Sequence, residues 1–339
     1  MPEIILKALR KFQALSDSRG VAFRARLLAW YDAHARDLPW RKSCDPYRVW
    51  LSEIMLQQTR VAAVIEHYYE FLKRFPTVEK LAAAREASVL AAWSGLGYYR
   101  RARMLHAAAK LIARNHGGQF PPTSAELLTL PGIGRYTAAA IASIAFGEPV
   151  AVVDGNVERV LQRLEGQSLA GEKLWEAAAK LLDRERPGDF NQAMMELGAT
   201  VCTPRAPACL ACPVLELCAT RGELPGAAKA RPQKKREIHY ALDLRNGDGA
   251  ASRKVFLVQR PANASLMPGM WELPEIQPPN DAKPDFVVRH SITVTNYTVQ
   301  VWRKPAASLG DGRWVGAESL GRVALTGLAR KILRHALME

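Results

Sequence analysis

The stretch LPGIGRYTA, residues 130–138, decides how the first half of this chain is expected to fold. Two glycines around an isoleucine let the backbone turn tightly between two helices, and the N–H groups that open the second helix have no helical partners. Such a helix start binds phosphate oxygens through these N–H groups and the helix dipole. The same pattern also suits an ordinary tight turn between helices, so both interpretations stay open on this stretch alone.

The hydrophobic pattern is helical as far as a basic linker. Residues 46–75 open with Pro46 and repeat apolar side chains at spacings of three and four, which predicts two helices. After GELPGAAKARPQKKREI, residues 222–238, the pattern changes to strands, as in ITVTNYTVQVW at 292–302, and closes with a helix over 328–337. The sequence therefore predicts a mainly α fold with a helical domain, a solvated basic linker and a smaller α+β domain.

Length and charge limit the classes of function. The chain has 339 residues, with 47 Lys and Arg against 33 Asp and Glu. The net charge of +14 favours a polyanion such as nucleic acid as partner, although solubility alone would also explain it. No run approaches the roughly 20 apolar residues of a membrane helix, and Lys7 and Arg10 interrupt the apolar start. We therefore expect a cytoplasmic protein with no membrane partner.

Four of the five cysteines lie within CTPRAPACLACPVLELC, residues 202–218. Cys202, Cys209, Cys212 and Cys218 follow the spacing C-x6-C-x2-C-x5-C. In a reducing compartment, clustered cysteines are more often metal ligands or redox groups than disulfides. A zinc site, an iron–sulfur cluster and unligated thiols all stay open on spacing alone. Cys44 has no partner in sequence and is expected to be a bystander.

Two carboxyl groups stand where an acid could act. Glu53, in VWLSEIMLQQT, falls at the edge of the apolar face of its predicted helix. That position suits either an ion pair with an arginine or a protonated acid in an apolar pocket. Asp154, in PVAVVDGNVERVLQRL, opens a helical run, which predicts either a helix N-cap or a carboxylate facing a developing positive charge.

Together, residues 23–224 resemble the helix-hairpin-helix DNA glycosylases with an iron–sulfur cluster, and within them the adenine DNA glycosylases, the MutY family. Seven stretches occur in one order, which is far more specific than any single motif. They are LPWR (38–41), PYRVWLSEIMLQQTRV (46–61), WSGLGYYRRARML (93–105), LPGIGRYTAAAI (130–141), VVDGNVERVL (152–161), FNQAMMELGA (190–199) and the four-cysteine run.

The resemblance implies an organisation of the chain. An N-terminal extension over 1–22 precedes a helical glycosylase domain over 23–224, whose four cysteines hold a 4Fe-4S cluster within 202–218. The cluster is expected to shape a loop that meets DNA, where Arg205 contacts a phosphate. The basic linker occupies 225–238, and a Nudix-like domain occupies 239–339.

Roles for the catalytic residues follow from the same resemblance. Glu53 matches the acid that protonates adenine, and Asp154 matches the carboxylate that stabilises an oxocarbenium-like sugar. Tyr136 matches a residue that assists Glu53, and Asn156 one that orients the site. One protonated and one ionised carboxyl is what dissociative glycosidic cleavage requires. Endonuclease III-type enzymes have a Schiff-base lysine where this chain has Tyr136, which predicts a monofunctional enzyme.

Further residues match DNA contacts in the family. Gln57 and Gln58 match residues that fill the space left when adenine is flipped out of the duplex. The residues expected to hold the phosphate backbone at the hairpin are Gly132, Gly134 and Arg135.

The second domain resembles the Nudix-like recognition domain of the family through QRP (259–261) and MPGMWELP (267–274). No acidic Nudix hydrolase box follows, so binding without hydrolysis is expected. In the family a Phe-Ser-His segment reads 8-oxoguanine, and here Ile292-Thr293-Val294 stands in its place. Thr293 is then the remaining hydroxyl, and Asn296 and Tyr297 are alternatives that could supply a donor and a stacking ring.

The sequence thus predicts a monomeric, bacterial, cytoplasmic enzyme that acts at the nucleoid. Its expected partner is double-stranded DNA with adenine opposite 8-oxoguanine or guanine, and its expected role is base excision repair. Two alternatives are a non-catalytic iron–sulfur protein that binds mismatches and a pyrimidine glycosylase of the endonuclease III type.

Overall fold

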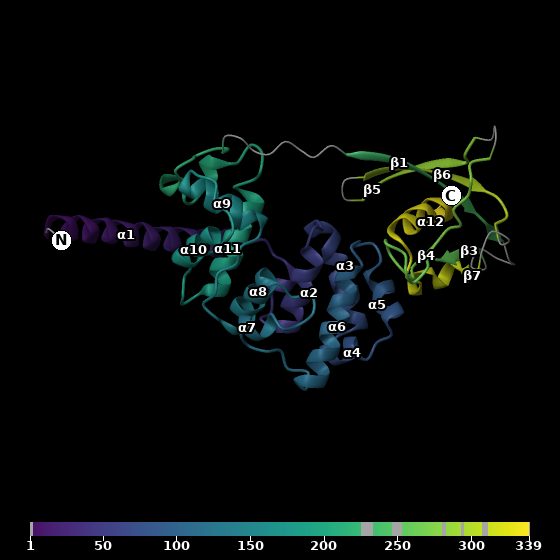
Figure 1. Cartoon of the computed structure of the whole chain (residues 1–339), viewed down its shortest axis with the longest axis horizontal. Helices are drawn as coiled ribbons and strands as arrows, with labels where there is room; N and C mark the ends of the chain where they lie inside the picture. Colours follow the sequence, from purple (N-terminus) through teal and green to yellow (C-terminus); the bar gives the residue numbers. More distant parts are fainter. Residues whose placement is uncertain are drawn as a thin grey trace. The chain divides into compact units, whose positions relative to one another are not determined.

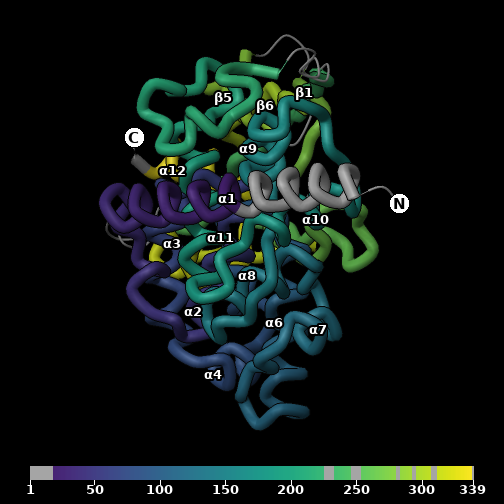
Figure 2. The backbone as a smooth tube through the Cα atoms, turned by 90° about the vertical axis from the view of Figure 1, so that its left-hand side faces the viewer, coloured from purple at the N-terminus to yellow at the C-terminus, as the bar shows by residue number. Residues whose placement is uncertain are grey.

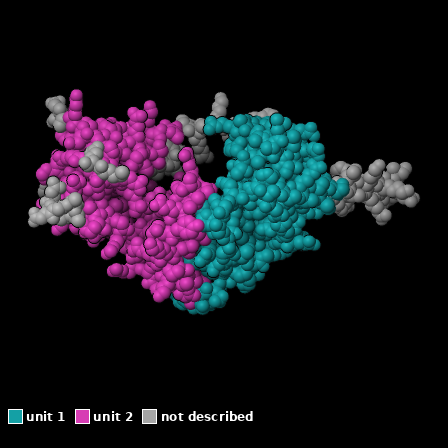
Figure 3. Space-filling model, turned by 180° about the vertical axis from the view of Figure 1, so that it is seen from behind, with its two compact units in different colours: residues 1–57, 114–228 teal, residues 58–113, 229–339 magenta. Residues whose placement is uncertain are grey.

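The computed structural model describes residues 3–224, 233–245, 253–279, 283–292, 295–306 and 311–338. The chain forms two compact units, shown in two colours in Figure 3. Unit 1 comprises residues 1–57 and 114–228, and unit 2 comprises residues 58–113 and 229–339. The helical segment 58–113, which the sequence groups with the first domain, therefore forms one compact body with the C-terminal region.

The elements of unit 1 are helices, and Figure 1 labels the α-helices but not the short 3-10 helices (η). They are α1 (Glu3–His34), η1 (Pro39–Arg41), α2 (Pro46–Leu56), α7 (Ser124–Leu127), α8 (Arg135–Phe146), α9 (Gly155–Glu165), α10 (Glu172–Leu181), α11 (Pro187–Thr200), η2 (Cys209–Ala211) and η3 (Leu215–Leu217).

The ends of these helices follow from local sequence. α2 begins at Pro46, whose fixed φ suits a first helical turn, and the Asp45 side chain accepts a hydrogen bond from the Arg48 N–H. α8 and α9 end at Gly147 and Gly166, which both take the left-handed conformation. These caps fix where the loops between the helices begin.

The core of unit 1 lies between α1, α8, α9, α10 and α11. Phe23 on α1 and Phe190 on α11 are both buried, with ring centroids 6.2 Å apart. α1 lies against α10 and α11, as Figure 2 shows. Leu161 of α9 and Leu197 of α11 complete the contact between these helices. This packing holds the start of α9 beside α11, where several site residues lie.

Unit 2 combines helices and strands. Its helices are α3 (Val61–Arg74), α4 (Val78–Ala82), α5 (Glu86–Trp93), α6 (Arg100–Asn115, whose last two residues fall in unit 1), η5 (Ala317–Arg322) and α12 (Gly327–Met338). Its strands are β1 (Lys234–Leu242), β2 (Leu244–Arg245), β3 (Lys254–Gln259), β4 (Trp271–Glu272), β5 (Phe286–Ile292), β6 (Thr295–Arg303) and β7 (Gly312–Gly316).

The strands form two sheets. One has the order β1-β6-β5, in which β1 is parallel and β5 antiparallel to β6. In the other, β3 pairs antiparallel with β2, β4 and β7. The common core contains Val299 of β6, Leu257 of β3 and Ile332 of α12, all fully buried. The C-terminal helix thus packs on both sheets, as expected for an α+β domain.

Hydrogen bonds join the helices of unit 2 to its sheet region. The buried hydroxyls of Ser94 and Tyr99 both donate to the Leu325 carbonyl at 3.0 Å. The Arg103 guanidinium donates to the Pro268 carbonyl at 2.6 Å. These three hydrogen bonds join 58–113 to the C-terminal region within one unit.

Two elements run across predicted domain boundaries. β1 begins at Lys234, within the predicted linker 225–238, because an edge strand tolerates exposed basic side chains as readily as a linker does. Residues 225–232 of that linker lie outside the described residues. α1 runs unbroken through residue 22, just before Phe23, where the resemblance to the family begins.

None of the helices among the described residues has the length and apolar character needed to cross a bilayer.

Candidate active site

Glu53 and Tyr136 form a buried pair in unit 1. α2 packs against α8, so that Glu53 near the end of α2 faces Tyr136 in the first turn of α8. The Tyr136 hydroxyl donates to Glu53 Oε2 at 2.5 Å and also lies 3.3 Å from Met195 Sδ. Glu53 is only 6% exposed. Glu53 and Tyr136 are 83 positions apart in the sequence, so only the folded chain brings these two predicted residues into contact.

The surroundings of Glu53 favour its protonated form. Burial raises the pKa of Glu53 to about 7, and the negative charge of Asp154 acts in the same direction. The hydrogen bond from Tyr136 and the charge of Arg41 lower this pKa but do not outweigh burial. Burial and the nearby carboxylates raise the pKa of Tyr136, so the phenol stays a donor. Glu53 can therefore carry a proton near neutral pH and deliver it to a bound group.

Asp154 is held at the start of α9. Its Oδ1 accepts hydrogen bonds from the N–H groups of Asn156 at 2.9 Å and Val157 at 2.7 Å, and its Oδ2 accepts from Asn156 Nδ2 at 2.9 Å. The N-cap interpretation is therefore correct. The hydrogen bonds of the cap also fix the direction of the Asp154 carboxylate. The negative charge of Asp154 raises the pKa of Glu53. The two carboxyls and Asn156, predicted as one site, do come together.

A chain of hydrogen bonds continues from Asn156 to the cysteine loop. Arg159 donates from Nη2 to Asn156 Oδ1 at 2.8 Å and to the Gly198 carbonyl at 2.7 Å, and from Nε to the Cys202 carbonyl at 2.7 Å. A Cβ on Gly198 would lie 2.6 Å from Asn156 Cβ and 2.9 Å from its carbonyl oxygen. The site thus depends on a glycine at the point where α11 meets α9.

Three charged residues of the site were not predicted. Glu196 on α11, 1% exposed, accepts hydrogen bonds from Arg36 at 2.6 and 2.7 Å and from Arg41 at 2.7 Å. Burial alone raises the pKa of Glu196, but the two arginines outweigh it and lower the pKa to about 2. Glu196 follows Met195, which touches Tyr136, and Arg41 acts electrostatically on Glu53. Arg41 and Glu196 stand inside two of the quoted motifs, LPWR and FNQAMMELGA, which could have indicated them.

The predicted hairpin lies between α7 and α8. Gly132 has φ of +75°, a conformation that favours glycine, and Gly134 is the N-cap of α8, which no side chain caps. Arg135 forms an ion pair with Glu172 at 2.5 Å, and its guanidinium lies 4.0 Å from the Trp175 ring centroid. The turn thus has the expected form, while Arg135 is engaged within the protein.

Strained backbone marks the turn after α2. Gln58 has φ of +55°, and the neighbouring Gln57 donates to Thr137 Oγ1 at 3.4 Å. Tyr98, which like Gln58 belongs to unit 2, also has a positive φ, of +47°, and its side chain is 40% exposed. Arg101 contacts the Tyr98 ring and donates to Thr59, next to Gln58. Tyr98 was not predicted, although it lies within the quoted stretch WSGLGYYRRARML.

The four cysteines share one loop after α11. Burial and the other three thiols raise the pKa of Cys212. Cys202 Sγ accepts from Arg163 Nη1 at 3.3 Å, and Cys218 Sγ accepts from the Arg221 N–H at 3.4 Å. Within the described ranges, no group of three or more His, Cys, Asp or Glu side chains has an arrangement that could hold a metal ion. A set of four sulfurs with N–H donors is chemically suited to an iron–sulfur cluster.

The remaining predicted residues have different outcomes. Arg205 is exposed on the cysteine loop, as a DNA contact requires. Thr293 lies outside the described residues. Tyr297 is 9% exposed and packs in the core of unit 2, paired with His290 across the sheet. The prediction that Tyr297 stacks on a base is therefore wrong, because its position in β6 points the ring into the core.

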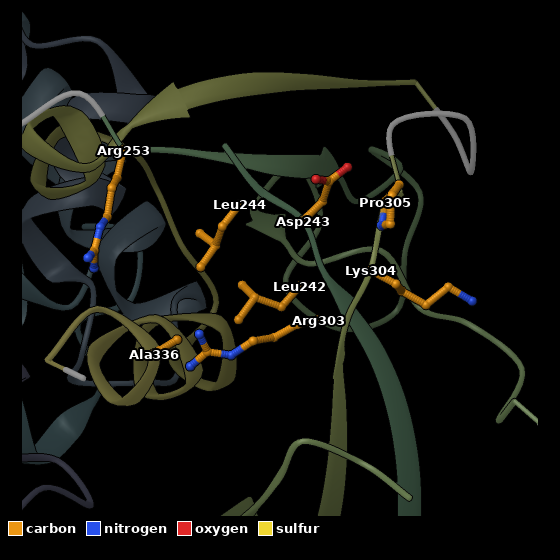
Figure 4. Close-up of a pocket in the computed structure, with 8 residues that line it drawn as sticks. All are labelled: Leu242, Asp243, Leu244, Arg253, Arg303, Lys304, Pro305 and Ala336. Carbon is orange, nitrogen blue, oxygen red and sulfur yellow. The ribbon is translucent and has the colours of Figure 1, made fainter. Parts of the chain in front are cut away.

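A separate pocket of about 530 Å³ lies in the sheet region (Figure 4). Arg253, Arg303 and Lys304 line it together with Asp243, whose carboxylate accepts the Ala306 N–H at 2.7 Å. It contains none of the predicted site residues.

Comparison with known proteins agrees with the fold of the helical region. Residues 51–184 match the family model of the HhH-GPD superfamily of base excision DNA repair proteins. A solved thermostable thymine-DNA glycosylase is 30% identical and covers 60% of this chain and 97% of its own, with a TM-score of 0.57. A non-covalent endonuclease III–DNA complex, 23% identical over 62% of this chain and 95% of its own, shares the fold with a TM-score of 0.51. The class is thus that of helix-hairpin-helix base excision repair proteins.

Within that class, the similar curated proteins are adenine DNA glycosylases. The human protein is 40% identical, over 81% of this chain and 61% of its own length. The protein of Schizosaccharomyces pombe is 34% identical, over 75% of this chain and 69% of its own length. The chain therefore belongs to the adenine DNA glycosylase family. It spans about three fifths of the length of the human relative.

Proposed function

We propose that this chain is a monofunctional adenine DNA glycosylase of base excision repair, which removes adenine mispaired with 8-oxoguanine or guanine. The observation that carries the proposal is the buried Glu53, whose pKa of about 7 suits a proton donor near neutral pH and whose carboxyl is held by a hydrogen bond from Tyr136. Family membership and the net charge of +14 support DNA as the partner.

The chemistry divides between two carboxyl groups. Protonated Glu53 gives its proton to the ring of an adenine flipped into the site, and the electron pair of the glycosidic bond leaves with the base. The sugar becomes cationic, and the ionised Asp154, oriented by Asn156, stabilises it until water adds. Tyr136 holds the Glu53 carboxyl in place. Since Tyr136 has no amine, no Schiff base forms there and the DNA strand stays uncut.

DNA contacts are proposed for residues of each unit. The N–H groups at the start of α8, after Gly132 and Gly134, take a backbone phosphate. The strained Gln58, with Gln57, fills the space that the flipped adenine leaves. The exposed ring of Tyr98 is suited to stack on a neighbouring base.

The four cysteines are proposed to hold a 4Fe-4S cluster, which when bound would shape the loop from Cys202 to Cys218. Arg205 on this loop would contact a phosphate. The donor set and the N–H groups directed at Cys202 and Cys218 support this assignment.

The C-terminal region is proposed to be a Nudix-like domain that reads 8-oxoguanine opposite adenine. At the exposed end of the β5–β6 pair, Ser291 Oγ donates to Asn296 Oδ1 at 2.6 Å, and Asn296 Nδ2 donates to Gln233 at 2.5 Å. This polar cluster supports recognition by Asn296 together with Thr293. We further propose a monomer that acts at the bacterial nucleoid.

Single-turnover release of adenine from duplexes with adenine opposite 8-oxoguanine, guanine or thymine tests the proposal. We expect release opposite 8-oxoguanine and guanine, faster opposite 8-oxoguanine, and little opposite thymine. Equal rates opposite 8-oxoguanine and guanine would contradict the proposal that the C-terminal region recognises 8-oxoguanine. Absence of release from every duplex would favour a protein that binds mismatches without catalysis, and strand cleavage trapped by borohydride would favour an endonuclease III-like enzyme.

A further inference from the structure

Arg163, on the last turn of α9, is a buried cation that no predicted role uses. It is only 5% exposed, and charged side chains are rarely so buried without partners. Its guanidinium faces the first part of the cysteine loop. Nη1 donates to Cys202 Sγ at 3.3 Å and to the Thr203 carbonyl at 2.7 Å, and Nη2 donates to the Pro204 carbonyl at 3.0 Å.

The backbone of the same residue holds the other end of the loop. The Arg163 carbonyl oxygen accepts hydrogen bonds from the Thr220 hydroxyl at 2.7 Å and from the Thr220 N–H at 3.1 Å. Cys218 Sγ lies 3.3 Å from the same oxygen. One residue therefore fixes both segments that carry the first and the last cysteine, 16 positions apart in the sequence.

We infer that Arg163 is a positioning residue for the cluster, one that closes the cysteine loop and donates an N–H···S hydrogen bond to the Cys202 thiolate. The inference rests on the proposed 4Fe-4S cluster. Hydrogen bonds to ligand sulfurs, and positive charge near them, stabilise the more reduced state of such a cluster and raise its reduction potential. Arg163 thus sets both how firmly the cluster is held and how readily it is reduced.

The matched test compares Arg163→Gln and Arg163→Lys with Arg26→Gln in the full chain. Arg26 also contacts the cysteine loop, through Glu216 Oε2 at 2.6 Å, but this exposed pair involves no sulfur. Iron and sulfide per chain, the half-life of the visible cluster absorbance under a chelator, and the midpoint potential are measured, with circular dichroism as the check on folding.

We expect Arg163→Gln to lose the cluster about 10 to 100 times faster than the wild type, the usual range for outer partners of a metal ligand. Its midpoint potential should be more negative. Arg163→Lys keeps the charge but lacks the planar set of donors, so its cluster lifetime should be intermediate. Arg26→Gln should match the wild type in both measurements.

Two results would overturn the inference. One is a folded Arg163→Gln or Arg163→Lys with wild-type cluster lifetime and potential. The other is loss of helical circular dichroism in both variants, which would give Arg163 a role in folding and not in holding the cluster. If the wild type itself takes up no iron and sulfide, the proposed cluster fails first, so the two failures are distinguishable.

Discussion

At the scale of single residues, the site depends on the protonation of one buried carboxyl. Burial raises the pKa of Glu53 to about 7, whereas the hydrogen bond that the Tyr136 hydroxyl donates to this carboxyl lowers the pKa. Asp154, fixed by three N–H groups, adds a negative field. These different surroundings are the basis for the different roles proposed for the two carboxyl groups.

The pH dependence of adenine release should follow from this protonation. In the proposed mechanism the active form of Glu53 is the protonated one, so the single-turnover rate should be level below pH 7 and fall about tenfold per unit well above it. In Tyr136→Phe the bond that lowers the pKa is lost, so the alkaline fall should move to higher pH even though the maximal rate decreases. Rate profiles of the two proteins check this, and an unchanged or acid-shifted midpoint in Tyr136→Phe would contradict it.

The residue scale also shows what sequence could predict. Glu53, Asp154, Tyr136 and Asn156 were predicted as one site from the family resemblance. The structure places them near one another, and their catalytic roles stay predictions. The buried ion pairs of Glu196 were not found, because Arg41 and Glu196 are 155 positions apart and no local pattern records such a pairing.

At the scale of elements, the contact between α9 and α11 places Asp154, the carboxylate proposed to stabilise the sugar cation. Gly198 lets the backbone of α11 approach Asn156, and its carbonyl accepts a hydrogen bond from Arg159. Asp154 and Asn156 open α9, so a displacement of this helix moves both.

Gly198→Ala should therefore damage the chemical step more than DNA binding. Its Cβ would meet backbone atoms of Asn156 at 2.9 and 3.0 Å, which only a shift of α9 relieves. Misplacement of a catalytic group by about 1 Å costs roughly a hundredfold in rate. Single-turnover rates and DNA affinity are measured beside Gly20→Ala, whose Cβ meets only Arg24 Nη1 at 3.4 Å. An undiminished rate in a folded Gly198→Ala would show that α9 tolerates the shift.

Elements were predicted well where the pattern is periodic and less well at their ends. The helices of the first half, the hairpin and the closing helix agree with the structure. The start of β1 was missed because its first residues are exposed and basic, as linker residues are. Tyr297 was misjudged because alternation gives two faces but not which of them is the core.

At the scale of the whole molecule, the net charge of +14 makes binding to DNA depend on salt. The basic side chains are not equally accessible to a DNA phosphate. Arg135 forms an ion pair with Glu172, whereas Arg205 is exposed on the cysteine loop.

Arg205→Gln should lower DNA affinity and reduce the slope of log affinity against log salt by about 0.9, the value for one phosphate contact. Binding titrations at several salt concentrations check this. Arg186→Gln, which removes an arginine paired with Asp32 and Asp189, serves as the control with an unchanged slope. An unchanged slope in Arg205→Gln would remove this residue from the DNA interface.

The division into two units could not be predicted from sequence. The periodic helices of 58–113 look alike whichever body they pack on, and buried hydroxyls such as Ser94 and Tyr99 leave no pattern that shows their acceptor. Composition and motifs indicated the class of protein, whereas the compact units depend on contacts between distant residues.

Release of adenine by Glu53→Gln under single-turnover conditions, with enzyme in excess over a duplex carrying adenine opposite 8-oxoguanine, tests the account most directly. Glutamine keeps the size of the side chain but has no acidic proton to give. We expect the variant to bind the duplex as the wild type does and to release adenine at least a hundredfold more slowly. Release at the wild-type rate would contradict the assignment of Glu53 as the acid, and with it the proposed mechanism.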